Sequence, residues 1–210
     1  MALIGTANWI PVGESTWSIV TRLALRNRFD WSEVRRVFGK KGLSSFQSAI
    51  GSHCDNPEII DLIRLARSIG CGLEALQPSF SDYYQVARVH TRNPRDGSPT
   101  LRQLRACTSC LEEGSHLLVH QLPWWARCPI HFEELTTKCT RCNAPFGFFE
   151  FSRPTKPIDT CSQCGKALFN WQSSPSAHQK ARLKFVSEYA DWIRTVRRGR
   201  NEQGGSFLWL

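Results

Sequence analysis

Nearly all cysteines of this chain, with one histidine, fall into four pairs whose partners are separated by two residues. The pairs are Cys107/Cys110, Cys128/His131, Cys139/Cys142 and Cys161/Cys164. Seventeen residues lie between the first and second pairs, seven between the second and third, and 18 between the third and fourth. A two-residue gap lets two side chains of one turn reach the same metal ion, and two such turns complete a tetrahedral zinc site. The spacing is typical of two zinc ribbons in tandem.

The spacing predicts two structural zinc ions, each held by four protein ligands. The first ligand set is Cys107, Cys110, Cys128 and His131, and the second is Cys139, Cys142, Cys161 and Cys164. With four protein ligands, neither site keeps an open position for a substrate. Seven of the nine cysteines fall in the pattern, which argues against disulfides or chance spacing. A cross-braced arrangement, in which the first pair joins the third, stays open.

A deaminase-like layout is the one hint of catalysis, because His131 and Glu133 precede the Cys139/Cys142 pair. Zinc deaminases combine such a histidine, a catalytic glutamate and a Cys-x-x-Cys pair. They place a helix and a strand between the two halves, and seven residues leave no room for these. The sequence therefore predicts a protein that is not an enzyme.

Composition limits the size and the surroundings of the protein. A chain of 210 residues has room for one or two small domains. No apolar run approaches the roughly 20 residues that cross a bilayer, and no basic-then-apolar signal opens the sequence. We expect a cytoplasmic protein that contacts no membrane, with reduced thiols available for zinc. The formal net charge of +9 suggests an anionic partner, and nucleic acid is the first candidate.

The positive charge lies at the two ends of the sequence. Lys plus Arg against Asp plus Glu is 7 against 3 in residues 1–54, 7 against 6 in 55–106, 6 against 6 in 107–170 and 7 against 3 in 171–210. Two zinc ions add +4 and seven thiolates add −7, which takes residues 107–170 to about −3 and the chain to about +6. Nucleic acid, if bound, should therefore meet the flanks.

The segments around the metal ligands predict a small protein that combines α-helices with zinc ribbons. It consists of an N-terminal helical domain (1–79), a linker with a short strand (80–106), a tandem zinc-ribbon module (107–170) and a C-terminal amphipathic helix with a flexible basic tail (171–210). A first helix begins near Glu14 and buries a stripe of Trp17, Val20, Leu23 and Ala24, with Arg22 off the stripe. A second starts at Asp30, with Glu33 completing a capping box, and stops at Gly39.

These two helices, with a third over 44–50, have the outline of a helix-turn-helix. DNA reading and simple bundle packing both fit this outline. A further helix over 56–69 is capped by Asn56, directs Leu62 and Ile63 to a core and ends at Gly70, and 72–76 add one turn. In the C-terminal helix, Leu183, Val186 and Tyr189 share the inner face.

Basic residues near the turns and helix ends are candidate nucleic-acid contacts, although solvated helix ends or a domain linker explain them as well. They are Arg35, Arg36, Lys40, Lys41, Arg92, Arg95, Arg194, Arg197, Arg198 and Arg200.

The sequence resembles the TniQ family of transposition-targeting proteins over most of its length. The likeness begins with Pro11, Glu14, Ser15, Trp17, Arg22, Leu23, Ala24 and Asn27, continues through Arg105 and the first Cys pair, and follows Trp124, Cys128, His131, Leu135, Cys139 and Cys142 to Cys161 and Cys164. Thr108 and Thr140 stand where the family often has proline. The chain is also shorter than relatives that carry a further DNA-reading domain, and closer in length to members found with RNA-guided transposons.

The resemblance implies an adaptor of transposition. It would link a target-site recogniser, either a DNA-binding protein or a CRISPR RNA-guided complex, to an AAA+ ATPase that regulates the transposase. The basic flanks would add contacts to DNA or RNA, and the protein would join the nucleoid when assembled on its target. The sequence does not decide whether the protein forms a homodimer. The alternative is a zinc-ribbon and helix-turn-helix transcription regulator that binds duplex DNA directly.

Overall fold

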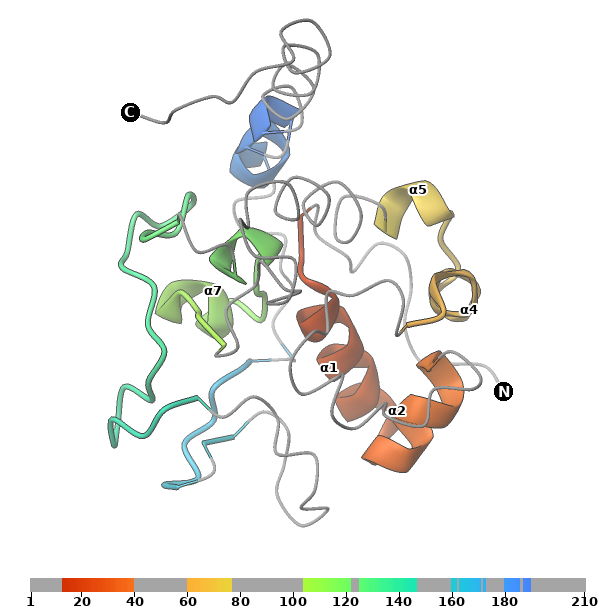
Figure 1. Ribbon diagram of the computed structural model, residues 1–210, viewed down its shortest axis with the longest axis horizontal. Coiled ribbons are helices and arrows are strands. Elements are labelled where there is room, and N and C mark those ends of the chain that lie inside the picture. The colour runs from red at the N-terminus through yellow and green to blue at the C-terminus, as the bar shows by residue number, and fades with distance from the viewer. Residues whose placement is uncertain are drawn as a thin grey trace, which may run out of the picture.

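Helix α1 lies at the centre of the fold, between a group of helices and the cysteine-rich loops (Figure 1). The computed structural model describes residues 13–39, 60–76, 104–121, 125–146, 160–161, 163–170, 172, 180–185 and 187–189. Helices α2, α4 and α5 lie on one side of α1, and α7 with the metal-ligand pairs lies on the other.

Helix α1 spans Thr16–Asn27 and begins two residues after the predicted start at Glu14. The Ser15 side chain caps it by accepting a hydrogen bond from the Ser18 backbone N–H at 3.2 Å. Glu14 instead forms an antiparallel bridge with Leu117. The N-terminal segment is thus joined to the cysteine-rich region before the helix starts.

Helix α2 spans Trp31–Phe38 and confirms the predicted capping box. The Glu33 backbone N–H donates to the Asp30 carboxylate, and the Asp30 backbone N–H donates to the Glu33 carboxylate, both at 2.9 Å. The predicted third helix over 44–50 lies outside the described residues. The helix-turn-helix therefore stays a prediction.

Helix α4 spans Leu62–Ile69, so the prediction of a helix from Asn56 was wrong in its start. Ile60 is extended in a bridge with Gly39, and the Asp61 side chain caps the helix by accepting from the Arg64 backbone N–H at 3.0 Å. The inward face also differs from the prediction, since Leu65 is fully buried and Ile63 is 52% exposed.

The predicted helix end at Gly70 is confirmed, and one more turn follows. Gly70 takes the left-handed conformation with φ 75°, and its N–H bonds back to the last turn of α4. Helix α5 then spans Leu73–Leu76.

One apolar core fills the space between α1, α2, α4 and α5. Its fully or nearly buried members come from all four helices and the segments beside them: Ile19, Val20, Leu23, Ala24, Phe29, Val34, Phe38, Ile60, Leu65, Ala66, Ile69 and Leu76. Trp17, on the same helix α1, belongs to another core that contains Cys139, Cys161 and Phe169. Helix α1 therefore contributes to the helical core and to the core beneath the second ligand set.

The cysteine-rich region has little regular structure. It contains α7 (Thr108–Glu112) and the 3-10 helix η3 (Leu118–Gln121). Isolated antiparallel bridges join Ala106 to Thr136, Arg127 to Glu134, Lys138 to Pro145 and Thr160 to Ala167. Short bridged loops of this kind are compatible with zinc-binding modules.

The C-terminal segment is helical over 180–185 and 187–189, in the region predicted to be an amphipathic helix. Its buried side agrees with the prediction at Tyr189, which is nearly fully buried, but not at Leu183, which is 46% exposed. The charged residue Arg182 is fully buried instead. Among the described residues, no helix is long and apolar enough to span a membrane.

Candidate metal centres

The structure gathers the first four predicted ligands into one site, called cluster 1: Cys107, Cys110, Cys128 and His131. His131 Nδ1 lies 3.4, 3.3 and 3.7 Å from the sulfurs of Cys107, Cys110 and Cys128. The Cys110 and Cys128 sulfurs are 3.7 Å apart. A tetrahedral zinc with bonds of about 2.3 Å to sulfur and about 2.0 Å to nitrogen gives S–S edges of about 3.8 Å and S–N edges of about 3.5 Å. The ligand atoms therefore fit a tetrahedral ion.

The last four ligands form cluster 2: Cys139, Cys142, Cys161 and Cys164. Sulfur pairs from opposite turns lie 3.7 Å (Cys139 to Cys164) and 3.6 Å (Cys142 to Cys161) apart. These separations also match a tetrahedral edge and exceed the roughly 2.05 Å of a disulfide bond. All seven cluster cysteines are free thiols. The structure joins adjacent pairs, so the cross-braced alternative is wrong.

Three of the four pairs share one backbone turn. The N–H of Phe132, Asn143 and Gly165 donates to the carbonyl four residues earlier, on Cys128, Cys139 and Cys161, at 2.9 to 3.0 Å. All three donors take the left-handed conformation, with φ of 58°, 57° and 69°. This turn directs backbone N–H groups at the first sulfur, as from Arg141 to Cys139 at 3.4 Å. Asn and Gly adopt positive φ readily, whereas Phe does so with strain.

The fourth pair is built on a helix instead of a turn, which its spacing did not indicate. Cys107 caps helix α7, and its sulfur accepts from the Cys110 backbone N–H at 3.5 Å. Cys110 lies in the first turn of that helix. The Cys110 backbone N–H in the first turn of α7 thus faces the Cys107 sulfur of cluster 1.

Two carboxylates surround cluster 1. His131 Nε2 lies 3.0 Å from Glu113 Oε1, with Nδ1 facing the sulfurs. A carboxylate at the far nitrogen of a metal-binding histidine fixes its tautomer and ring orientation. Glu133 accepts hydrogen bonds from the hydroxyl and backbone N–H of Ser109, and these lower the pKa of Glu133. Glu133 therefore holds helix α7, and the deaminase-like grouping is absent here because His131 and Cys139 belong to different clusters.

In cluster 1, hydrogen bonds between the thiols shift their pKa values in opposite directions. Bonds from Cys107 and Cys110 lower the pKa of Cys128, and bonds with Cys107 and Cys128 raise that of Cys110. For Cys107, the bond with Cys110 acts downward, but the bond with Cys128 and burial raise its pKa to about 12. A metal ion must therefore displace protons from Cys107 and Cys110.

In cluster 2, backbone N–H groups stabilise the thiolates. Burial acts upward on Cys161, but hydrogen bonds from the N–H of Cys164 and Gln163 prevail and lower its pKa to about 6. Burial is likewise outweighed at Cys139, whose pKa is lowered by the N–H of Arg141 and Cys142. At Cys142 the Ala144 N–H acts downward, but burial and hydrogen bonds with the other thiols raise its pKa to about 12. The turns of cluster 2 thus prepare Cys139 and Cys161 for a cation.

A buried ion pair joins α1 to cluster 1, and sequence reasoning missed it. Glu14 and Arg22 are 0% and 3% exposed, and their side chains meet at 2.5 Å. Glu14 also accepts from the Ser18 hydroxyl at 2.5 Å, and Arg22 donates to the Gly114 carbonyl. Burial raises the pKa of Glu14, and the charge of Arg22 opposes that rise. Both residues belong to the motif that carries the family resemblance, which was the available indication.

His116 adds a second polar link between the same two segments. Its Nδ1 lies 2.7 Å from the Ser15 hydroxyl and its Nε2 lies 2.8 Å from the Arg105 carbonyl. A carbonyl only accepts, so Nε2 carries the proton and Nδ1 accepts from Ser15. Burial, with a smaller contribution from His120, lowers the pKa of His116 to about 3. His116 is therefore neutral, and no residue pattern had singled it out.

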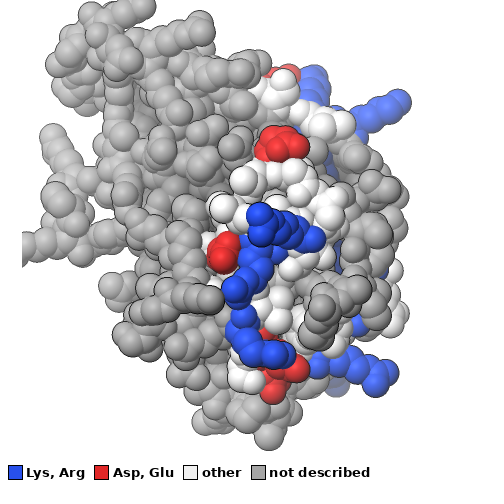
Figure 2. All heavy atoms as spheres, turned by 90° about the vertical axis from the view of Figure 1, so that its right-hand side faces the viewer, with Lys and Arg blue, Asp and Glu red and all other residues white. Residues whose placement is uncertain are grey.

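Of the ten predicted nucleic-acid contacts, Arg36 is the only one whose side chain falls in the described part of the chain, and it is exposed. The other nine side chains lie outside it. The face of the molecule shown in Figure 2 carries a run of Lys and Arg side chains with acidic side chains beside it. Arg28 and Arg67, which the prediction did not include, are also exposed. On this face the described residues therefore offer a short run of basic side chains with acidic ones beside it, rather than a surface of uniform positive charge.

A comparison with protein families gives a match over more than half of the chain. The sequence model of the TniQ family matches residues 10–135. The matched region contains α1, the Glu14–Arg22 pair and all of cluster 1, and it ends before cluster 2. None of the curated proteins matches this sequence.

Proposed function

Because the chain belongs to the TniQ family, we propose that this transposition-associated protein is an adaptor without catalytic activity. It would link a target-site recogniser to an AAA+ ATPase that regulates the transposase, acting in the cytoplasm on target DNA. The recogniser would be a DNA-binding protein or a CRISPR RNA-guided complex.

The observation that best supports this proposal is the closed geometry of both clusters. Each has four ligand atoms within 4.8 Å of one another, which fills a tetrahedral ion and leaves no position for a substrate. We propose zinc as the ion at both clusters, two per chain. Zinc would supply folding energy and hold the loops, and the chain's own residues would present a rigid surface to partners.

Metal analysis tests the zinc assignment directly. Purified protein should contain close to two zinc ions per chain. Cys71→Ser is the matched control, because Cys71 is a half-buried free thiol outside both clusters, and it should leave the metal content unchanged. One ion or none in the unaltered chain would contradict the assignment.

Co-elution with partners tests the adaptor role. The chain should co-elute with the ATPase encoded beside it and with the targeting complex. Cys128→Ser, which removes a buried ligand, should abolish both associations, and Cys71→Ser should preserve them. A folded, metal-loaded chain that binds neither partner would refute the adaptor proposal.

Nucleic-acid contacts through the basic flanks form a separate part of the proposal. Binding to duplex DNA or RNA should weaken with salt, with the logarithm of affinity falling by about 0.9 per phosphate contact for each tenfold rise in salt. Arg36→Ala should make that slope shallower by about 0.9, which corresponds to one phosphate contact fewer. An unchanged slope would remove Arg36 from the contact set.

A further inference from the structure

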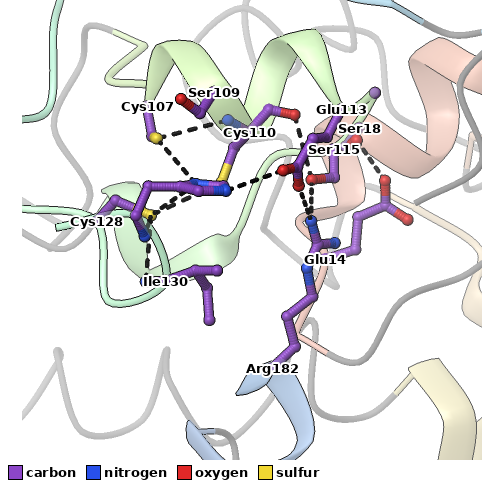
Figure 3. Close-up of polar contacts among 12 residues, drawn as sticks. Glu14, Ser18, Cys107, Ser109, Cys110, Glu113, Ser115, Cys128, Ile130 and Arg182 are labelled. Atoms are coloured by element: carbon purple, nitrogen blue, oxygen red, sulfur yellow. Dashed lines mark hydrogen bonds and ion pairs between the residues drawn. The ribbon is translucent and has the colours of Figure 1, made fainter. Parts of the chain in front are cut away.

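We propose that Glu113 couples the metal at cluster 1 to the docking of the C-terminal helix, by bridging His131 and Arg182. Glu113 Oε1 lies 3.0 Å from His131 Nε2, and its Oε2 lies 3.3 Å from Arg182 Nη2 (Figure 3). One carboxylate thus serves a metal ligand on one side and the C-terminal helical segment (180–185 and 187–189) on the other. The inference rests on the proposed metal centres and is independent of the adaptor role.

The chemistry of the histidine sets the direction of the first contact. His131 Nδ1 faces three sulfurs, so it is the nitrogen that would bind the ion. Nε2 then carries the proton and donates it to Glu113. When a metal holds the ring, this hydrogen bond is fixed in place and the carboxylate is oriented toward Arg182. Such outer carboxylates typically change metal affinity by about 10- to 100-fold when removed.

Arg182 needs this carboxylate because its side chain is fully buried. It is 0% exposed and donates to Ser115 Oγ at 2.6 Å and to Glu113. A buried guanidinium without an anionic partner is strongly destabilising. The other nearby carboxylate, Glu14, makes its direct contact with Arg22, and the charge of Arg182 acts on it only at longer range. Losing the correct position of Glu113 therefore weakens the burial of Arg182.

Apolar contacts carry the same coupling to the rest of the helix. Trp125, shortly before Cys128, contacts Phe185 edge-on with ring centroids 5.4 Å apart, and Phe185 stacks on Tyr189 at 6.0 Å. Tyr189 shares a buried core with three of the cluster 1 cysteines. The C-terminal helix therefore rests on the loop that holds the metal ligands, by charge at Arg182 and by aromatic packing at Phe185 and Tyr189.

The test measures metal affinity and helix docking in the full chain, with Glu113→Gln. The amide keeps the shape of the side chain, but its NH2 group must face either the His131 Nε2–H or the Arg182 guanidinium, and both of these are donors. Cobalt(II) distinguishes the clusters, because cluster 1 has three thiolates and an imidazole and cluster 2 has four thiolates. Cobalt affinity at cluster 1 should fall about tenfold, while cluster 2 in the same molecule stays unchanged.

Hydrogen exchange reports on docking. With metal bound, the amides of 180–185 and 187–189 should exchange about tenfold faster in Glu113→Gln than in the unaltered chain. Amides of α1, α2 and α4 should keep their protection, because only the contact to Arg182 is weakened. Both proteins are compared with metal bound, since metal removal would unfold the region of cluster 1 and hide a local change in docking.

Glu112→Gln is the matched control, because Glu112 is the exposed neighbour on helix α7. It should behave as the unaltered chain in both measurements. Should Glu113→Gln fail to fold, Arg182→Lys is the second variant. It keeps the positive charge but loses the planar guanidinium and its several N–H donors, and it should lower the cobalt affinity of cluster 1 by a few-fold. Wild-type affinity and exchange in these variants would overturn the coupling. Absence of metal at both clusters would instead refute the metal centres on which it rests.

Discussion

Clusters 1 and 2 have nearly the same ligand spacing but are held by different parts of the molecule. Cluster 1 is connected to α1 and the C-terminal helix through side chains, among them Glu113, Arg182 and the Glu14–Arg22 pair. Cluster 2 also packs on α1, through the apolar core that Trp17 shares with Cys139 and Cys161. The polar contacts to its sulfurs come mainly from the backbone of its own two turns, and Cys142 is exposed. Spacing therefore determines which ligands meet, whereas the surrounding side chains determine how much of the fold depends on them.

Removing one ligand from each cluster should give the largest difference. Cys128→Ser removes a buried ligand that supports the cluster 1 core. The variant should therefore be largely unfolded already at the lowest temperature of the scan. Structural zinc contributes about 10 to 16 kcal/mol of apparent binding energy. Cys142→Ser removes an exposed ligand and should leave α1, α2 and α4 folded with one zinc. Thermal unfolding by circular dichroism, with metal analysis, checks both; equal losses would abolish the contrast.

Breaking a buried and an exposed ion pair, both of which lie near cluster 1, should give the next largest effect. Arg22→Ala leaves Glu14 buried without its partner and should destabilise the protein by about 3 to 5 kcal/mol. Arg127→Ala breaks the exposed pair with Glu134 in the turn region and should change stability by at most about 1 kcal/mol. Urea unfolding of loaded protein measures both, and a small loss for Arg22→Ala would show that the buried pair is dispensable.

Acidification should weaken the side of the molecule that contains cluster 1 through His116. Its pKa is about 3 in the folded chain and about 6.5 when unfolded. Between these values the unfolded state binds an extra proton. The contribution of His116 to the free energy of unfolding is therefore fully present above about pH 6.5 and is lost as the pH falls toward 3.

The free energy of unfolding should fall by up to about 1.4 kcal/mol for each pH unit because of His116 alone. Any loss of metal would add to this. His116→Gln cannot titrate and is the control. Urea unfolding of both proteins from pH 7 to 5, with metal content monitored, should show a smaller slope for the variant. Equal slopes would show that His116 contributes nothing to the pH dependence.

The turns themselves should give the smallest effect. Gly165→Ala in cluster 2 should cost about 1 kcal/mol, although nothing lies within 4 Å of the added Cβ, because φ is 69°. Phe132→Gly in cluster 1 should be nearly neutral, because Phe132 is 75% exposed and its strain is relieved while the unfolded chain gains freedom. Denaturant midpoints measure both, and a large loss for Phe132→Gly would reveal a packing role for the ring.

The sequence predicted the ligand groups well because cysteine spacing leaves few geometric solutions. The capping box at Asp30 and Glu33 and the helix end at Gly70 were also predicted correctly, because both depend on local backbone chemistry. The choice between an ordinary turn and a helix start at Cys107 was not, since both accept the same two-residue gap.

Buried charges are what sequence reasoning could not place. Counting an apolar stripe put Leu183 inside and Arg22 outside, yet Arg22 and Arg182 are buried and Leu183 is exposed. A buried arginine is identifiable only through its partners, and these come from distant segments, as Glu113 does for Arg182. Likewise, Ile63 fits a helix from Asn56, and the bridge at Ile60 that delays the helix depends on Gly39.

The contact between Arg22 and the Gly114 carbonyl also sets an order of events during translation. Glu14 reaches Arg22 within one short stretch of chain, but Gly114 follows Arg22 by 92 residues. At about 5 to 20 residues per second, the ribosome needs about 5 to 20 s to add them. Helix α1 therefore emerges long before its acceptor, and its charged side chains stay hydrated until cluster 1 is synthesised.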